Sequence, residues 1–168
     1  MKSKTYIIAE AGINHNGDIN MAKKLIMAAK DCGADCVKFQ TFKASEFISD
    51  PNQTYTYFSQ GKKVTESMLK MFERYQFSET EWIEIVAFCK ANNIQFSSTA
   101  QNFSDLEFLN SICDLPFIKV GSDDLTSIQM LKKYASYGKK MIISTGMAYA
   151  SEIEDAVEAI RNVGNNDI

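Results

Sequence analysis

Four short apolar runs in this sequence finish in polar residues. These residues are of the types that bind an anion or transfer a proton. The runs read YIIA, CVKF, FIKV and MIIS, and the polar residues at or near their ends are Glu10, Lys38, Gln40, Lys119, Ser122 and Ser144. A lysine inside an apolar strand is costly unless it meets a partner, because a buried ammonium must be paired or lose its proton. Two such lysines near hydroxyl groups predict a cradle for a phosphate or carboxylate ligand.

A purely structural interpretation of these lysines is the alternative. Either lysine could form an ion pair with Glu10, Asp123 or Asp124, or reach solvent. We favour the ligand because two lysines recur, each near hydroxyl groups expected on the same rim. Those hydroxyl residues are Thr99, Ser122 and Ser144. Glu10 is a candidate general base, substrate contact or ion-pair partner.

The only histidine, His15, lies in a turn sequence, Asn14 to Gly17. A lone histidine there stabilises the turn or contacts a ligand more often than it binds a metal, because metal sites need several converging ligands. We therefore count Asn14 and His15 as candidate substrate contacts and predict no metal ligand in the chain. Gln40 follows Lys38 by two residues, which places both on one strand face, where Gln40 could hydrogen-bond a ligand.

Five strand-helix units must position these residues. The patterning predicts strands at residues 5–9, 34–39, 94–98, 117–120 and 141–144, and helices at 21–32, 64–75, 82–92, 103–112, 127–137 and 151–163. The expected helix caps are Asp18, Ser78 with Glu81, Ser104, and Ser151 with Glu154. Residues 41–63 have no clean period and predict a long loop of the lid type. Two α/β architectures fit, an open doubly wound sheet and the first part of an eight-unit barrel, and both bind ligands at the carboxyl ends of their strands.

Length and charge restrict the class of protein. The 168 residues suit one domain, and the formal net charge of −3 argues against nucleic-acid binding, which needs a basic face. No apolar run approaches the roughly 20 residues of a membrane helix, and no signal peptide is visible. Four cysteines without a C-x-x-C pair read as reduced core residues. We expect a cytoplasmic protein without membrane or nucleic-acid partners.

Four motifs resemble the N-acetylneuraminate (sialic acid) synthase family, which includes legionaminate, pseudaminate and spore-coat polysaccharide synthases. They are IAEAGINHNG at 8–17, GADCVKFQT at 33–41, IKVGS at 118–122 and ISTGM at 143–147. The resemblance covers essentially the whole chain but only about the first half of such an enzyme. It implies that residues 1–168 form about five of the eight units of a TIM barrel. The later units and a C-terminal antifreeze-like domain would be absent.

The chemistry that this resemblance implies is a transferase reaction. The complete enzyme would condense phosphoenolpyruvate with an N-acetylated amino-sugar aldehyde, giving a nonulosonic acid and phosphate. A divalent metal, manganese or magnesium, is expected with histidine ligands beyond Ile168, and the complete enzyme is expected to be a homodimer. Carried over by position, the catalytic residues would be Glu10, Lys38 and Lys119. The substrate contacts would be Gln40, Thr99, Ser122, Ser144 and Asp124, the last at a position where the family usually has Glu.

Two other function classes stay open. A non-catalytic half-barrel or open α/β binding module would assemble with another chain, because open strand edges invite pairing. Another phosphoenolpyruvate-using or aldolase-type barrel would keep the lysines and replace the amino sugar. On the enzyme hypothesis, the isolated 168-residue chain is expected to be inactive, because it lacks a complete metal site.

Overall fold

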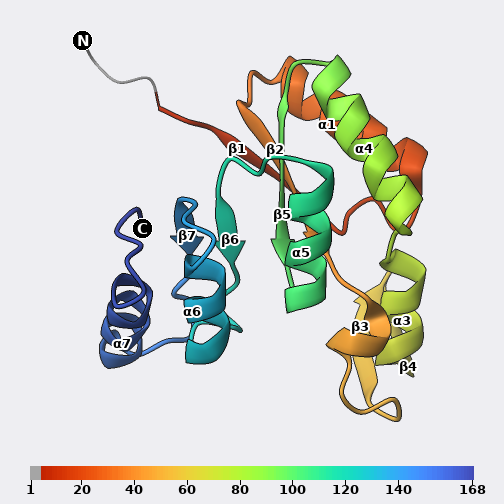
Figure 1. The fold of residues 1–168 in the computed structure, drawn as a ribbon. Helices are drawn as coiled ribbons and strands as arrows, with labels where there is room; N and C mark the ends of the chain where they lie inside the picture. Colours follow the sequence, from red (N-terminus) through yellow and green to blue (C-terminus); the bar gives the residue numbers. More distant parts are fainter. Residues whose placement is uncertain (1–4) are drawn as a thin grey trace.

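One parallel sheet of five strands organises the chain in the computed structural model, which describes residues 5–168. The strands are β1 (Ile8–Gly12), β2 (Cys36–Thr41), β5 (Gln95–Ala100), β6 (Ile118–Val120) and β7 (Met141–Ile143), in that spatial order (Figure 1). Each new strand pairs with the one before it. A doubly wound sheet reverses its strand order at a switch point, whereas a barrel does not. The sequential order therefore identifies the barrel type, of which five units are described.

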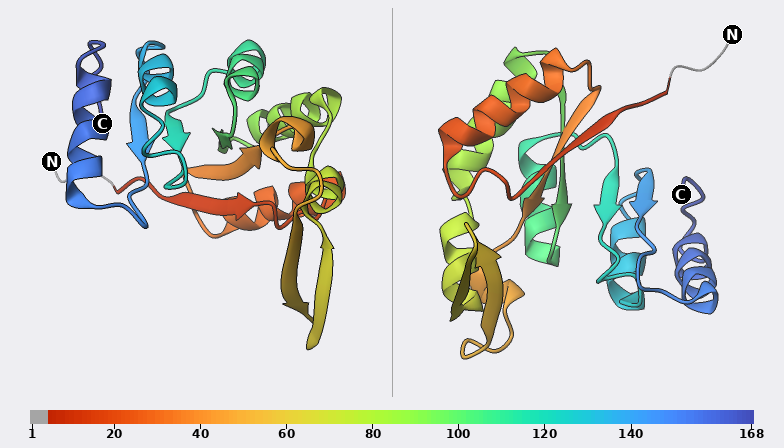
Figure 2. Two further views of the ribbon diagram at one scale, coloured as in Figure 1. Left: turned by 90° about the horizontal axis from the view of Figure 1, so that it is seen from below. Right: turned by 180° about the vertical axis from the view of Figure 1, so that it is seen from behind.

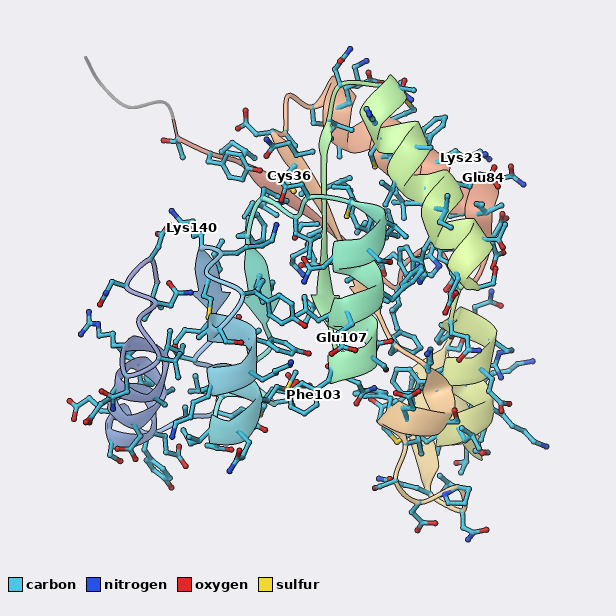
Figure 3. The ribbon with its side chains drawn as sticks, viewed as in Figure 1. Lys23, Cys36, Glu84, Phe103, Glu107 and Lys140 are labelled. Atoms are coloured by element: carbon cyan, nitrogen blue, oxygen red, sulfur yellow. The ribbon has the colours of Figure 1, made fainter. Side chains whose placement is uncertain are left out.

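Five helices follow these strands: α1 (Ile19–Asp31), α4 (Glu79–Ala91), α5 (Phe103–Ile112), α6 (Ile128–Ala135) and α7 (Ala150–Arg161). Right-handed crossovers between sequential parallel strands place all of them on one face of the sheet. In the left view of Figure 2, α7, α6, α5 and α4 follow one another along the same side of the strands. Lys23 of α1 and Glu84 of α4 point toward each other (Figure 3), with their Nζ and Oε1 atoms 2.5 Å apart.

The two faces of the sheet differ in chemistry. Along β2, Val37 and Phe39 are buried in the apolar core between sheet and helices, whereas Lys38 and Gln40 line a pocket on the opposite face. This follows from the two-residue period of a strand. The core residues that the strands contribute are Ala11, Val37, Phe39, Phe96, Ala100, Ile118, Val120 and Met141. The face under the helices is thus mainly apolar, with Thr41 and Ser98 hydrogen-bonded to each other there, and the charged residues lie on the other face.

Two of the four predicted helix N-terminal caps are correct. The Asp18 side chain accepts from the backbone N–H of Asn20 at 2.8 Å, and Ser78 and Glu81 form the predicted capping box. The predicted caps at Ser104 and Ser151 are wrong. Helix α5 begins at Phe103 after Asn102, while the Ser104 hydroxyl donates to Glu46. Helix α7 begins at Ala150, and a Glu152 carboxylate oxygen accepts from the backbone N–H of Tyr149 at 2.8 Å.

The region after β2 is the main departure from the prediction. Residues 41–63 were expected to be irregular and 64–75 helical. The structure has α2 (Ala44–Phe47), an antiparallel hairpin of β3 (Thr54–Ser59) and β4 (Lys62–Ser67), and α3 (Met68–Tyr75). The hairpin turns at Gln60 and Gly61, both with positive φ, as in type I′ turns. It projects clear of the sheet (Figure 2, left). Its residues are mostly exposed, so no buried-strand pattern marked it.

In the described part of the chain, no helix has the length and apolar character needed to cross a membrane.

The loop between β1 and α1 packs tightly against the end of α3, which yields a stability prediction. A Cβ atom on Gly17 would lie 2.0 Å from the Arg74 carbonyl oxygen, and Gly17 has φ +75°. We expect Gly17→Ala to cost about 3 kcal/mol or more in the free energy of unfolding, because backbone must move as well as adopt a left-handed conformation. Urea denaturation of the purified chain measures this.

Gly33→Ala is the matched control. Gly33 has φ +80°, yet nothing lies within 4 Å of its added Cβ atom. It should cost only the left-handed penalty of about 1 kcal/mol. Equal losses in the two variants would show that contact between the loop and α3 contributes nothing.

Candidate active site

Strand register brings the predicted polar residues to one end of one face. Glu10 pairs with Lys38, Gln40 with Thr99, and Thr99 with Lys119. Neighbouring strands in register place such side chains side by side on the sheet. Because all five strands are parallel, their carboxyl ends meet at the same edge. Residues from four different strands therefore gather there.

A pocket of about 380 Å³ lies at this edge. Seven of the ten predicted site residues line it: Glu10, Lys38, Gln40, Thr99, Lys119, Ser122 and Ser144. The two lysines thus share one pocket, as the anion cradle requires. The pocket also contains Asp123, Gln101, Ile13 and Phe72.

Lys38 is the more deeply buried of the two lysines, with 7% of its surface exposed. Its Nζ atom lies 2.5 Å from Glu10 Oε2 and donates to Thr99 Oγ1 at 3.2 Å. Burial of an ammonium without a partner would be costly, so the ion pair with Glu10 compensates it. The side chain of Glu10 is 53% exposed, so the pair joins a fixed cation to a carboxylate at the pocket mouth.

Lys119 lies across the pocket and is half-buried. Its Nζ donates to Ser144 Oγ at 2.6 Å and to the Val120 carbonyl oxygen. Burial lowers the pKa of Lys119, and the positive charge of Lys38 lowers it further. Two cations close enough to repel are stabilised by an anion between them. This electrostatic arrangement favours a ligand with more than one negative charge.

Two polar pocket residues were not among the predicted ligand contacts. Gln101 follows Thr99 by two residues, so the spacing that selected Gln40 would have found it. Asp123 was considered only as an ion-pair partner for a lysine; it lines the pocket and raises the pKa of Lys119. Ile13 and Phe72 had no signal, because Ile13 lies in the loop after β1 and Phe72 lies on α3, where it packs against Phe42 and Phe47.

Asp124 does not line this pocket. It lines a neighbouring one of about 560 Å³ with Glu46, Ser104 and Ser127. Gln101 borders both pockets, so the two adjoin. Burial raises the pKa of Asp124, and the charge of Asp123 raises it further. Asp124 is therefore placed to meet a group that extends from the two-lysine pocket.

His15 and Asn14 also lie outside the pocket lining. His15 is 1% exposed and stacks on Phe77 with ring centroids 4.2 Å apart. Its Nδ1 atom accepts from the backbone N–H of Gly17 at 3.1 Å, which stabilises the turn. Burial lowers its pKa to about 4. The geometry corresponds to the turn-stabilising role, and Asn14 is exposed on the same turn.

Among residues 5–168, no three or more His, Cys, Asp or Glu side chains form a group that could hold a metal ion. The one histidine is engaged with Gly17 and Phe77. The residues described here therefore do not fit a metal site by themselves.

The sequential parallel sheet defines a protein of the TIM-barrel type, and the two-lysine pocket is its candidate active site. The chain belongs to the NeuB family, whose sequence profile matches residues 25–168. Membership agrees with the resemblance that the four motifs carry.

Two curated relatives indicate the breadth of this family. N,N'-diacetyllegionaminic acid synthase of Campylobacter jejuni is 43% identical over 94% of this chain and 47% of its own length. N-acetylneuraminate-9-phosphate synthase of Drosophila melanogaster is 37% identical over 96% of this chain and 43% of its own length. The chain thus spans about half the length of the curated relatives that it matches.

Solved structures agree with the fold. The crystal structure of N-acetylneuraminic acid (sialic acid) synthetase from Leptospira borgpetersenii in complex with citrate superposes with a TM-score of 0.83 at 29% identity. It covers 97% of this chain and 52% of that one. Truncated 3-deoxy-D-arabino-heptulosonate 7-phosphate synthase from Thermotoga maritima shares the fold with a TM-score of 0.66 at 16% identity.

The environment of His15 predicts a specific loss of stability in acid. Because its folded pKa of about 4 lies below the unfolded value of 6.5, protons bind the unfolded chain more tightly. The contribution of neutral His15 to the free energy of unfolding is therefore complete above pH 6.5. It is lost as the pH falls toward 4, by about 3 kcal/mol. Urea denaturation between pH 4 and 7 should show that His15→Asn removes this slope.

The titration of Asp105 has the opposite effect on stability in acid, so the experiment must subtract it. Burial raises its pKa to about 6, so its protonated form stabilises the fold as pH falls. The difference between wild type and His15→Asn isolates the histidine, since Asp105 is present in both. Parallel pH profiles for the two proteins would contradict the prediction.

Proposed function

We propose that this chain carries the phosphoenolpyruvate-binding part of a nonulosonic-acid synthase. The complete enzyme would condense phosphoenolpyruvate with an N-acyl amino-sugar aldehyde, N-acetylmannosamine or a relative of it, and release phosphate. The observation that carries the proposal is the convergence of Lys38 and Lys119, each with a hydroxyl partner, in one pocket. Family membership supports the reaction class.

The charge of the pocket suits this ligand. Phosphoenolpyruvate has a phosphate and a carboxylate, about three negative charges in all, and needs cations spaced for both ends. Lys38 with Thr99, and Lys119 with Ser144, supply two such donor pairs. Ser122 adds a further hydroxyl on the pocket wall. Donors fixed before the ligand arrives cost no reorganisation during the reaction.

In the proposed reaction, C3 of phosphoenolpyruvate attacks the aldehyde carbon, water adds at C2, and phosphate leaves by C–O cleavage. The lysines and hydroxyls of this chain would hold both anionic ends, so that C3 faces the pocket mouth. Gln40 and Glu10 line the same pocket and would lie beside the reacting carbons. The adjoining pocket with Asp124 would receive the amino sugar.

Several features of the complete enzyme belong to this proposal and not to the described residues. The manganese or magnesium ion would take its ligands from outside this chain, since residues 5–168 contain no fitting group. The remaining barrel units, the antifreeze-like domain, the homodimer and the cytoplasmic location are likewise proposed for the whole protein.

The first test is binding of phosphoenolpyruvate to the chain by isothermal titration calorimetry. Lys38→Met and Lys119→Met should each weaken binding about 10- to 100-fold, because each removes charge-assisted hydrogen bonds. At pH 7 we also expect Lys119→Met to unfold at a midpoint no lower than wild type. A lysine of lowered pKa destabilises the fold below that pKa, and the effect disappears above the unfolded value.

Lys140→Met is the matched control. Lys140, labelled in Figure 3, precedes β7 at the amino end of the sheet and pairs with Asp167 at 3.7 Å. The affinity of the Lys140→Met variant for phosphoenolpyruvate should stay within about twofold of that of wild type, because an exposed ion pair contributes little. An equal loss in all three variants would mean that net charge, not the pocket, binds the ligand.

The second test concerns turnover by the chain alone. With Mn²⁺, phosphoenolpyruvate and N-acetylmannosamine we expect no phosphate release above background, because the metal site is incomplete. A phosphate-release assay on the purified 168-residue chain measures this. Robust turnover would refute the assignment of the metal ligands to a region outside this chain.

A non-catalytic binding module is the second candidate. The open ends of the sheet favour it, since β1 and β7 each pair with only one strand in the described sheet. Such edges offer backbone groups to another chain. If the purified chain binds no phosphoenolpyruvate but associates with a partner chain, that result would support the binding module over the enzyme.

A further inference from the structure

The Glu10 carboxylate is paired with Lys38, the cation that the proposed ligand needs. Its Oε2 atom lies 2.5 Å from Lys38 Nζ, within the pocket that would hold the anion. Lys38 has one other polar partner, Thr99, in the described part of the chain. A phosphate or carboxylate oxygen bound to Lys38 would therefore compete with the Glu10 carboxylate for the same ammonium group.

The two partners of this ion pair differ in freedom. The Lys38 side chain is 9% exposed and bonded to Thr99, so it stays in place. The Glu10 side chain is 53% exposed, so its carboxylate can turn toward solvent more readily than the Lys38 ammonium can. Separation of the pair therefore moves the carboxylate and leaves the ammonium where the ligand meets it.

The balance of charge favours a multivalent anion over Glu10. An ion pair with a half-exposed partner contributes little, because water solvates the released carboxylate. A ligand with two or three charges meets Lys38 and Lys119 together, along with the hydroxyls of Thr99 and Ser144. It also relieves the repulsion that lowers the pKa of Lys119.

We infer that Glu10 is an internal competitor for Lys38, and that anion binding displaces its carboxylate toward the pocket mouth. This inference rests on the proposed function and adds a coupling between the two substrates. In this structure the carboxylate is bound to Lys38. Once the anion occupies Lys38, Glu10 is free to accept hydrogen bonds from hydroxyl or amide donors of a second substrate.

Titration of inorganic phosphate and of phosphoenolpyruvate into the chain tests the competition. Glu10→Gln should bind both anions about tenfold more tightly than wild type, because the neutral amide competes weakly for the ammonium. Glu10→Asp keeps the charge, but its side chain is one methylene shorter and reaches Lys38 less well. It should therefore also bind more tightly, by about threefold or more.

Asp123→Asn separates competition from the general electrostatic field. Asp123 lines the same pocket, yet within the described residues it forms no ion pair with either lysine. Its loss removes the same charge and should change anion affinity by less than about threefold. Thermal unfolding of each variant verifies that the fold is kept.

The outcomes distinguish failure of the Glu10 competition from failure of the anion site itself. Equal gains for Glu10→Gln and Asp123→Asn, with no gain for Glu10→Asp, would overturn the competition and leave the anion site intact. Unchanged or weaker binding by Glu10→Gln would overturn it as well. If neither wild type nor Glu10→Gln binds either anion, the proposed phosphoenolpyruvate site fails together with the inference.

Discussion

The buried ammonium of Lys38 is the constraint on which the site depends. A lysine in the middle of an otherwise apolar strand must be compensated, and here a carboxylate and a hydroxyl from the neighbouring strands compensate it. These two groups reach Lys38 only if β1 and β5 flank β2 in this register. The strand order, the polar face and the anion pocket therefore follow from one electrostatic requirement.

Convergence across the sheet turns this requirement into a site. Parallel strands in sequential order expose their carboxyl ends along one edge, so residues distant in sequence share a pocket without a dedicated loop. Lys119 and Ser144 reach the pocket from β6 and from the segment after β7. Two lysines and two carboxylates, Glu10 and Asp123, then balance each other in this pocket. The proposed multivalent anion would meet this balance of charges already in place.

Local patterns predicted most of the architecture, and they failed where a segment has no buried face or where a contact is long-range. Asp18 and Ser78 were found as caps because a cap is a contact within three residues. The β3–β4 hairpin was missed because it is exposed on most of its surface and lacks a buried face. His15 was equally ambiguous, since its burial depends on Phe77, which lies more than sixty residues further along the chain.

The sequence by itself determined that polar residues end apolar strands, and hence that two lysines and several hydroxyls lie at strand ends. It also determined the family, because four motifs recur in order. The residue pattern left barrel and doubly wound sheet open and the family resemblance implied the barrel, which the strand order of the tertiary structure confirms. Only packing decided that Asp123 and Gln101 join the pocket while Asp124 borders the next one and His15 is buried. Side-chain direction after a strand end depends on loop conformation, and the loop is shaped by contacts that no local pattern encodes.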